Sequence, residues 1–191
     1  MAPRQVILIT DGDRVAKETV EEVARQVGGR CISASAGNPT PLTGLELVEQ
    51  IQMAAHDPVL VMFDDSGSAG KGRGEQALEY VMRHPEVEVL GVVAVASNCY
   101  PVQGTPVDIA LDREGRIVES SVDKDGLEMI DAPLHIFGDT LDVLNAHQVP
   151  IIIGVGDVGK MDHYDDPLWG APVTTKAVRM ILDYHKDSPT E

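Results

Sequence analysis

The chain has 191 residues, of which 15 are Lys or Arg and 31 are Asp or Glu, so its formal net charge is -16 at pH 7. This length is typical of one domain, and a hydrophobic content of 43% is enough for a packed core, which excludes a disordered chain. The chain has no basic run and only 4% aromatic residues. Direct binding of nucleic acid is therefore disfavoured, because it normally requires cations for the phosphates and rings for the bases.

Neither a membrane span nor an export signal is expected. The longest apolar runs, 90–96 and 149–155, are far shorter than the roughly 20 residues that cross a bilayer, and charged residues follow the N-terminus too soon for a signal peptide. We therefore expect a soluble protein that is not secreted. The two cysteines, Cys31 and Cys99, have no CxxC partner, so reduced structural thiols are favoured over a redox role for Cys99.

Apolar segments alternate with amphipathic segments along most of the chain. Continuous apolar strands separated by helices are typical of a parallel sheet that is covered on both faces. Residues 107–122 instead alternate around a turn at 113–115, which predicts a β-hairpin at an edge, outside the parallel core. We therefore predict a single α/β domain over 1–191, a three-layer sandwich of Rossmann-like or Toprim-like type with a β-hairpin excursion. In chain order, strands are predicted over 6–10, 30–35, 59–63, 87–97 and 151–155, and helices over 14–27, a segment that Thr43 caps, 74–83, 139–147 and 173–186.

Acidic residues follow three of the predicted strands. Asp11 and Asp13 follow the first strand, Asp64 and Asp65 the third, and Asp157 the last. Because ligands of open parallel sheets bind beyond the carboxyl ends of the strands, these five carboxylates are candidate ligands for Ca²⁺ or Mg²⁺. The alternative is that Asp11, Asp13 and Asp65 cap helices and form tight turns, as Asp commonly does after a strand. The sequence leaves both interpretations open.

A glycine-rich segment, GSAGKGRGE, follows Asp65. Its Lys71 and Arg73 precede a predicted helix N-terminus, where backbone N–H groups attract anions, so both are candidate anion-binding residues; the alternative is a plain connector. The Lys-Ser/Thr pair of a Walker A loop is missing, which argues against nucleotide hydrolysis. Residues 154–159 match GxGxxG, but no helix is predicted directly after them, which argues against a dinucleotide site. The six histidines lack the spacing of a zinc site.

Longer blocks of sequence carry a family resemblance over about 5–185. These blocks are VILITDGD, GGRCIS, SAGNPTPLTG, DPVLVMFDDSG, EVLGVVAVAS, VDKDG and PIIIGVGDVGKM. Together they resemble the soluble form of stage V sporulation protein AE. This family belongs to endospore-forming bacteria, and its operon encodes mostly membrane proteins that move dipicolinic acid, with calcium, into the developing spore.

The resemblance implies a non-enzymatic accessory protein of sporulation. Its expected partners are the membrane proteins of the dipicolinate transport system, and its expected location is cytoplasmic or peripheral to the spore inner membrane. The resemblance supplies no catalytic residues, and it leaves a homo-oligomer open.

The chain also has a weaker similarity to the Toprim fold, in which an acid after the first strand and a DxD pair after a later strand hold Mg²⁺. Asp11 and Asp64 have suitable positions, but the first acid is Asp rather than Glu, and the pair reads Asp64-Asp65-Ser66 instead of DxD. This similarity implies an alternative function, a Mg²⁺-dependent phosphotransfer or nuclease-type enzyme. The net charge argues against it.

Overall fold

The computed structural model describes residues 2–66, 71–97, 104–138 and 140–187. Its strands are β1 (Arg4–Ile9), β2 (Arg30–Cys31), β3 (Val59–Met62), β4 (Val87–Val95), β5 (Thr105–Pro106), β6 (Ile109–Leu111), β7 (Ile117–Val118), β8 (His135–Ile136) and β9 (Ile152–Val155). Its α-helices are α1 (Arg14–Val27), α2 (Gly44–Met53), α3 (Arg73–Arg83) and α4 (Pro172–Asp187), and its 3₁₀ helices are η1 (Ser33–Ser35), η2 (Asp142–Ala146) and η3 (Pro167–Trp169).

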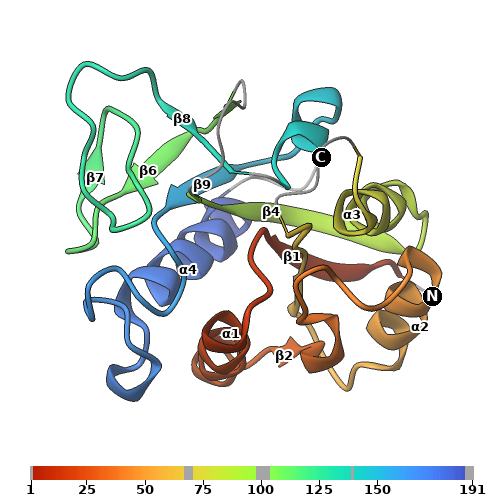
Figure 1. The fold of residues 1–191 in the computed structure, drawn as a ribbon. Coiled ribbons are helices and arrows are strands. Elements are labelled where there is room, and N and C mark those ends of the chain that lie inside the picture. Colours follow the sequence, from red (N-terminus) through yellow and green to blue (C-terminus); the bar gives the residue numbers. More distant parts are fainter. Residues whose placement is uncertain (1, 67–70, 98–103, 139, 188–191) are drawn as a thin grey trace.

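A seven-stranded sheet forms the centre of the molecule, with the strand order β2-β3-β1-β4-β9-β6-β7 (Figure 1). Neighbouring strands are parallel except β6 and β7, which form an antiparallel hairpin at one edge. The prediction that β1, β3, β4 and β9 share one parallel sheet, with the hairpin at its edge, is therefore confirmed.

Helices cover both faces of this sheet. Ile7 and Ile9 of β1 pack with residues of α1 and α4 in one hydrophobic cluster. Val6 and Leu8, whose side chains point to the opposite face, pack with residues of α2, α3 and η2 in a second cluster. Because both faces are buried, the central strands need apolar residues at every position, which explains their unbroken apolar sequence. The three-layer α/β sandwich is confirmed (Figure 1).

The predicted strand over 30–35 is wrong beyond Cys31. The chain leaves β2 and turns into the 3₁₀ helix η1, and the Ser35 hydroxyl donates to the carbonyl oxygen of Ile32 at 2.6 Å. The same hydroxyl accepts a hydrogen bond from the backbone N–H of Met62 at 2.9 Å. A side chain thus replaces the backbone partner that a longer strand would have supplied.

The predicted hairpin at the edge is joined to the main sheet, because β6 pairs in parallel with β9. The C-terminal half departs from the prediction in two respects. First, β5 and β8 form a second, two-stranded antiparallel sheet that the sequence pattern did not indicate. Second, the predicted helix over 139–147 is the short 3₁₀ helix η2.

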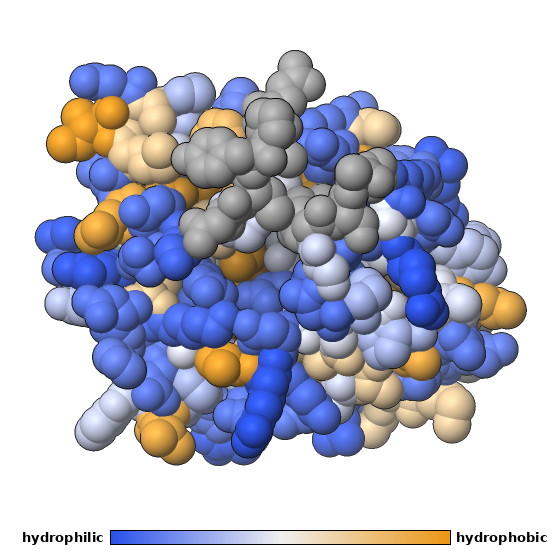
Figure 2. Space-filling view, in the orientation of Figure 1, coloured by the Kyte–Doolittle hydropathy of each residue, from blue (hydrophilic) through white to orange (hydrophobic). Residues whose placement is uncertain are grey.

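The face of the molecule seen in Figure 2 is mainly hydrophilic, with hydrophobic side chains scattered over it and gathered at the upper left, on the side of β6 and β7. Exposed apolar residues of this region include Ile117 (60% exposed), Leu127 (46%) and Ile130 (81%). Within the part of the chain that the structure describes, no helix combines the length and the apolar composition that crossing a membrane requires.

Candidate functional site

The neighbouring parallel strands β1 and β3 have connections that leave their carboxyl ends on opposite faces of the sheet. The connection after β1 leads to α1 on one face of the sheet, and the connection after β3 leads to α3 on the other face. Ligands of open α/β sheets bind beside such switch points, beyond the carboxyl ends of the strands. Gly12 and Asp64 meet there closely: a Cβ on Gly12 would lie 3.0 Å from the Asp64 Cβ and 2.8 Å from the carbonyl oxygen of Gly37. A side chain at position 12 would therefore collide with its neighbours.

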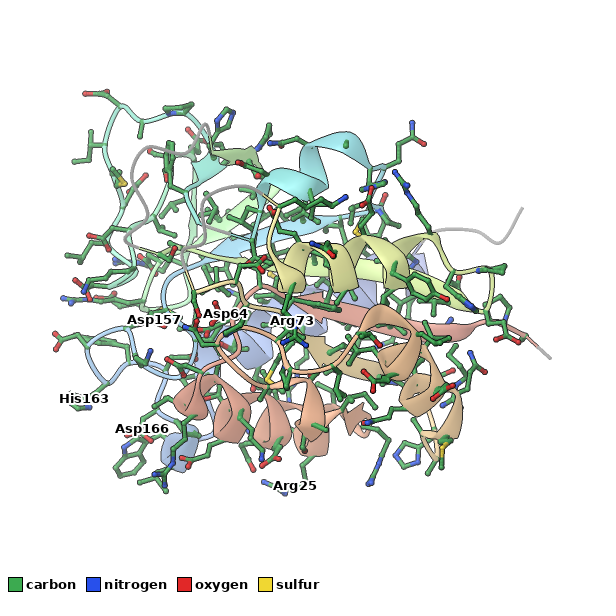
Figure 3. The ribbon with its side chains drawn as sticks, turned by 45° about the vertical axis from the view of Figure 1, so that its right-hand side comes forward. Arg25, Asp64, Arg73, Asp157, His163 and Asp166 are labelled. Atoms are coloured by element: carbon green, nitrogen blue, oxygen red, sulfur yellow. The ribbon has the colours of Figure 1, made fainter. Side chains whose placement is uncertain are left out.

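Three of the five predicted metal ligands come together at this end of the sheet. Carboxylate oxygens of Asp11, Asp13 and Asp157 all lie within 4.8 Å of one another. We call these three residues the acidic cluster. Asp64 and Asp157 lie at the same end of the sheet in Figure 3, whereas His163 and Asp166 lie further out in the loop after β9. Among the described residues, the acidic cluster is the single group of three or more His, Cys, Asp or Glu side chains close enough to hold one ion.

Asp11 is the buried member of the cluster, with 8% of its surface exposed. Its Oδ1 accepts a long hydrogen bond of 3.3 Å from the backbone N–H of Asp13. Its Oδ2 is enclosed and has no hydrogen-bond partner among the described residues. Burial, reinforced by the negative charges of Asp13 and Asp157, raises the pKa of Asp11 well above its ordinary value of 3.8. The charge of Asp11 is therefore poorly compensated by the protein itself.

Lys160 supplies the positive charge of the site, and sequence reasoning missed it. Its Nζ donates to Asp13 Oδ2 at 2.5 Å and to the two Asp157 oxygens at 3.0 and 2.9 Å. Partial burial works against the charged ammonium, but these hydrogen bonds outweigh it and raise the pKa of Lys160. The available signal was a lysine three residues after Asp157 in a tight turn, but its second partner, Asp13, is distant in sequence.

Two of the predicted metal ligands cap helices. Asp13 is the N-cap of α1 and accepts a hydrogen bond from the backbone N–H of Ala16 at 2.9 Å. Partial burial opposes its ionisation, but the hydrogen bonds from Lys160 and Ala16 prevail and lower the pKa of Asp13. Asp65 accepts hydrogen bonds from the backbone N–H groups of Gly74 (2.6 Å) and Glu75 (2.7 Å), in the first turn of α3. The alternative interpretation, that these acids are caps, is confirmed for both residues.

Asp64 and Asp65 both lie outside the acidic cluster. Asp65 is 1% exposed and turned towards α3, and the Oδ1 of Asp64 accepts a hydrogen bond from the backbone N–H of Ser66 at 3.2 Å. The predicted five-carboxylate site therefore reduces to three carboxylates, with Asp64 beside them across Gly12.

The two candidate anion-binding residues have partners within the protein. Lys71 forms an ion pair with Glu79 of α3, and the guanidinium of Arg73 donates to the carbonyl oxygen of Pro41 at 3.0 Å. Residues 67–70 of the same segment lie outside the described part of the chain. Anion binding by Lys71 and Arg73 stays a prediction.

The GxGxxG match and the cysteines do not add a further candidate site. Turns and the 3₁₀ helix η3 follow residues 154–159, rather than the α-helix that a dinucleotide site requires. Burial raises the pKa of the Cys31 thiol to about 12, which fits the expected unreactive thiol; Cys99 lies outside the described residues.

Comparison with known proteins identifies the family. A family model described as "Stage V sporulation protein AE1" matches residues 5–185, and no curated protein and no solved structure matches the chain. The match confirms the resemblance seen in the sequence blocks, whereas the similarity to the Toprim fold stays a prediction. Because the match spans nearly the whole chain, this sporulation-related protein belongs to the stage V sporulation protein AE1 family.

Proposed function

We propose that this protein is a non-enzymatic accessory of the membrane machinery that moves dipicolinic acid into the developing spore, and that it acts by contact with membrane proteins of that machinery. The observation that carries the proposal is the family match over residues 5–185. The sequence resemblance implies the transport system as the setting in which members of the family work.

The charge of the chain supports a membrane-protein partner. The formal net charge is -16, and the cytoplasmic loops of membrane proteins carry an excess of Lys and Arg. Complementary charge steers association and favours the correct partner. The exposed apolar residues Ile117, Leu127 and Ile130 add a surface of the composition that protein interfaces bury at their centre.

The arrangement of the carboxylates supports a non-enzymatic role. A Toprim-type site needs the acids after the first strand and after the later strand to hold Mg²⁺ jointly. With Asp64 as the first acid of the DxD pair, Ser66 occupies the position of the second acid, and Asp65 between them caps α3. The chain therefore has a hydroxyl where the Toprim-type enzyme needs its second carboxylate.

Deletion of the gene in an endospore-forming host tests the proposal. The deletion strain should grow normally and form spores with a low dipicolinate content or an altered germination rate, and a wild-type copy at another locus should restore both. Spore dipicolinate, released by heat, and the rate of germination are the measurements. Normal values for both, in a strain without a second copy of the gene, would contradict the proposed function.

A direct search for the partner complements the deletion. The tagged full chain should be cross-linked in sporulating cells and purified, and membrane proteins of the dipicolinate system should co-purify with it. Purification at high salt without cross-linking should lose them, because charge attraction between exposed groups is screened within about 3 Å at roughly 1 M salt. Co-purification of cytosolic proteins alone would contradict contact with this machinery.

A further inference from the structure

One carboxylate oxygen of Asp11 is buried and has no hydrogen-bond partner among the described residues. This oxygen is Oδ2, and Asp11 as a whole is more than nine-tenths buried. A buried carboxylate oxygen without a partner is costly, and such atoms are rare in folded proteins. The turn after β1 uses Oδ1 of Asp11, so the turn does not explain why Oδ2 is buried.

The protein's own cation compensates only part of the negative charge. The acidic cluster brings three carboxylates together, and Lys160 donates to Asp13 and Asp157 but forms no hydrogen bond with Asp11. Three carboxylates against one ammonium leave an excess of negative charge in a partly buried site. A cation of higher charge would neutralise more of it.

We propose that Asp11, Asp13 and Asp157 bind a calcium ion, which takes the place of the Lys160 ammonium. Carboxylates at the ends of strands and in loops are the oxygen ligands that hard divalent cations prefer. The three ligand oxygens lie within 4.8 Å of one another, close enough to share one ion. Calcium is favoured over magnesium because it accepts irregular oxygen sites on flexible loops, whereas Mg²⁺ demands near-ideal octahedral geometry and gives up its water ligands reluctantly.

Exchange between the ammonium and calcium is physically simple at this site. The side chains of Asp13, Asp157 and Lys160 are 35%, 29% and 38% exposed, so the cluster is open to solvent on one side and closed at Asp11. Lys160 can turn its long side chain into water without moving the backbone. Calcium then joins the same segments that Lys160 joins, the N-terminus of α1 and the loop after β9, and adds the end of β1 through Asp11.

The inference rests on the geometry of the acidic cluster and is independent of the proposed function. The test is isothermal titration of the full, chelator-treated chain with CaCl₂ and with MgCl₂ at fixed ionic strength, together with melting scans under the same conditions. The wild type should bind one Ca²⁺ with an affinity at least about tenfold higher than that for Mg²⁺. Calcium should raise the melting temperature, because an ion that binds only the folded state stabilises that state.

Three variants separate this site from general attraction to an acidic surface. Asp11→Asn keeps the size of the side chain but removes its charge, and should weaken calcium binding by about tenfold or more. Lys160→Met removes the competing ammonium and should strengthen calcium binding several-fold. Asp64→Asn is the matched control, since Asp64 is a neighbouring acid at the same end of the sheet and lies outside the cluster. It should bind calcium as the wild type does.

Each result bears on the proposal. Loss of binding in Asp11→Asn with a normal circular dichroism spectrum, and tighter binding in Lys160→Met, would support it. The absence of a calcium response in the wild type, or equal affinities of the wild type and Asp11→Asn, would overturn the site. Unchanged or weaker binding in Lys160→Met would overturn the exchange with the ammonium, and equal affinities for Ca²⁺ and Mg²⁺ would overturn the assignment of calcium.

Discussion

Two buried aspartates at the end of the sheet show how the surrounding donors decide what one residue type does. Asp165 is 0% exposed and accepts hydrogen bonds from the N–H groups of Gly159 (2.9 Å), Val173 (2.8 Å) and Thr174 (3.0 Å) and from the Thr174 hydroxyl (2.6 Å). Asp11 is also buried, but among the described residues it accepts a single hydrogen bond, of 3.3 Å, from the backbone N–H of Asp13. Asp165 is thus a structural residue that ties the start of α4 to the loop after β9, whereas Asp11 keeps one carboxylate oxygen without a hydrogen-bond partner among the described residues.

A third carboxylate, Asp112, provides a prediction at the scale of one residue. It is 5% exposed and accepts hydrogen bonds from the N–H groups of Glu114 (2.9 Å) and Arg116 (2.8 Å) and from the Arg116 guanidinium (2.7 Å). Burial opposes ionisation, but these hydrogen bonds outweigh it and lower the pKa of Asp112 below 3.8. A carboxyl whose pKa is lower in the folded state stabilises the fold above its unfolded pKa, and this stabilisation is lost as the pH falls through the folded value.

Asp112→Asn should therefore lower the free energy of unfolding by about 1–2 kcal/mol at neutral pH, and the difference from the wild type should shrink as the pH falls below about 3.8. Urea unfolding at a series of pH values measures this difference in the free energy of unfolding. The control is Asp123→Asn, in an exposed turn where Asp123 accepts from Asp125 and Leu127, with an expected change of about 0.5 kcal/mol or less. A difference for Asp112→Asn that stays constant down to acid pH would contradict this account.

At the scale of elements, the helices differ in where their N-terminal caps come from. Thr43 caps α2 locally, in a capping box with Glu46, and the sequence pattern predicted this cap. The N-cap residue of α3 is Gly72, which has no side chain to offer, and the cap comes instead from Asp65 at the end of β3. The start of α3 is thus fastened to the sheet by a charged group.

The cap that Asp65 provides for α3 should stabilise the fold more than the cap that Thr43 provides for α2. Asp65→Ala leaves two buried N–H groups of α3 without acceptors and should lower the free energy of unfolding by about 3 kcal/mol, whereas Thr43→Ala, at an exposed helix start, should cost about 1 kcal/mol. Asp65→Asn, which keeps one acceptor oxygen, should fall between them. Thermal and urea unfolding, followed by far-UV circular dichroism, give the three values. Equal losses for Asp65→Ala and Thr43→Ala would mean that Asp65 does not hold α3.

At the scale of the whole molecule, the excess of acidic groups sets the response to salt. The chain has 31 acidic and 15 basic residues, so the folded state repels itself more than an expanded chain does. Many basic side chains are already paired on the surface, as in the pairs Arg14–Glu18 and Arg25–Glu22. The excess acidic side chains therefore dominate the long-range electrostatic field of the molecule.

Raising the KCl concentration from roughly 0.01 M to about 0.15 M shortens the screening length from about 30 Å to about 8 Å and should raise the urea midpoint of unfolding. A chelator must be present, so that traces of calcium at the acidic cluster do not contribute. A midpoint that falls with salt would show that the surface ion pairs stabilise the fold more than the excess charge destabilises it.

The sequence by itself determined the architecture of the parallel core and the family. Strands β1, β3, β4 and β9 are covered on both faces, so they must be continuously apolar, and this property can be read from the chain without its partners. The helices could be predicted because their apolar spacing, the Thr43 cap and the terminating Gly28 are local signals. The acids after the strands were likewise visible, and the order of the strands brings three of them together.

Only the tertiary structure decided how these parts meet. Lys160 reaches Asp13 over 147 residues of sequence, and β6 joins β9 over more than 40, so neither contact follows from a local pattern. The choice of Asp65 as a cap and Asp11 as the unsatisfied acid depends on which N–H groups each carboxylate faces after packing. Local spacing determines which elements form, because helix and strand periods are properties of a short segment. The partners of a charged side chain depend on distances across the fold, which no short segment contains.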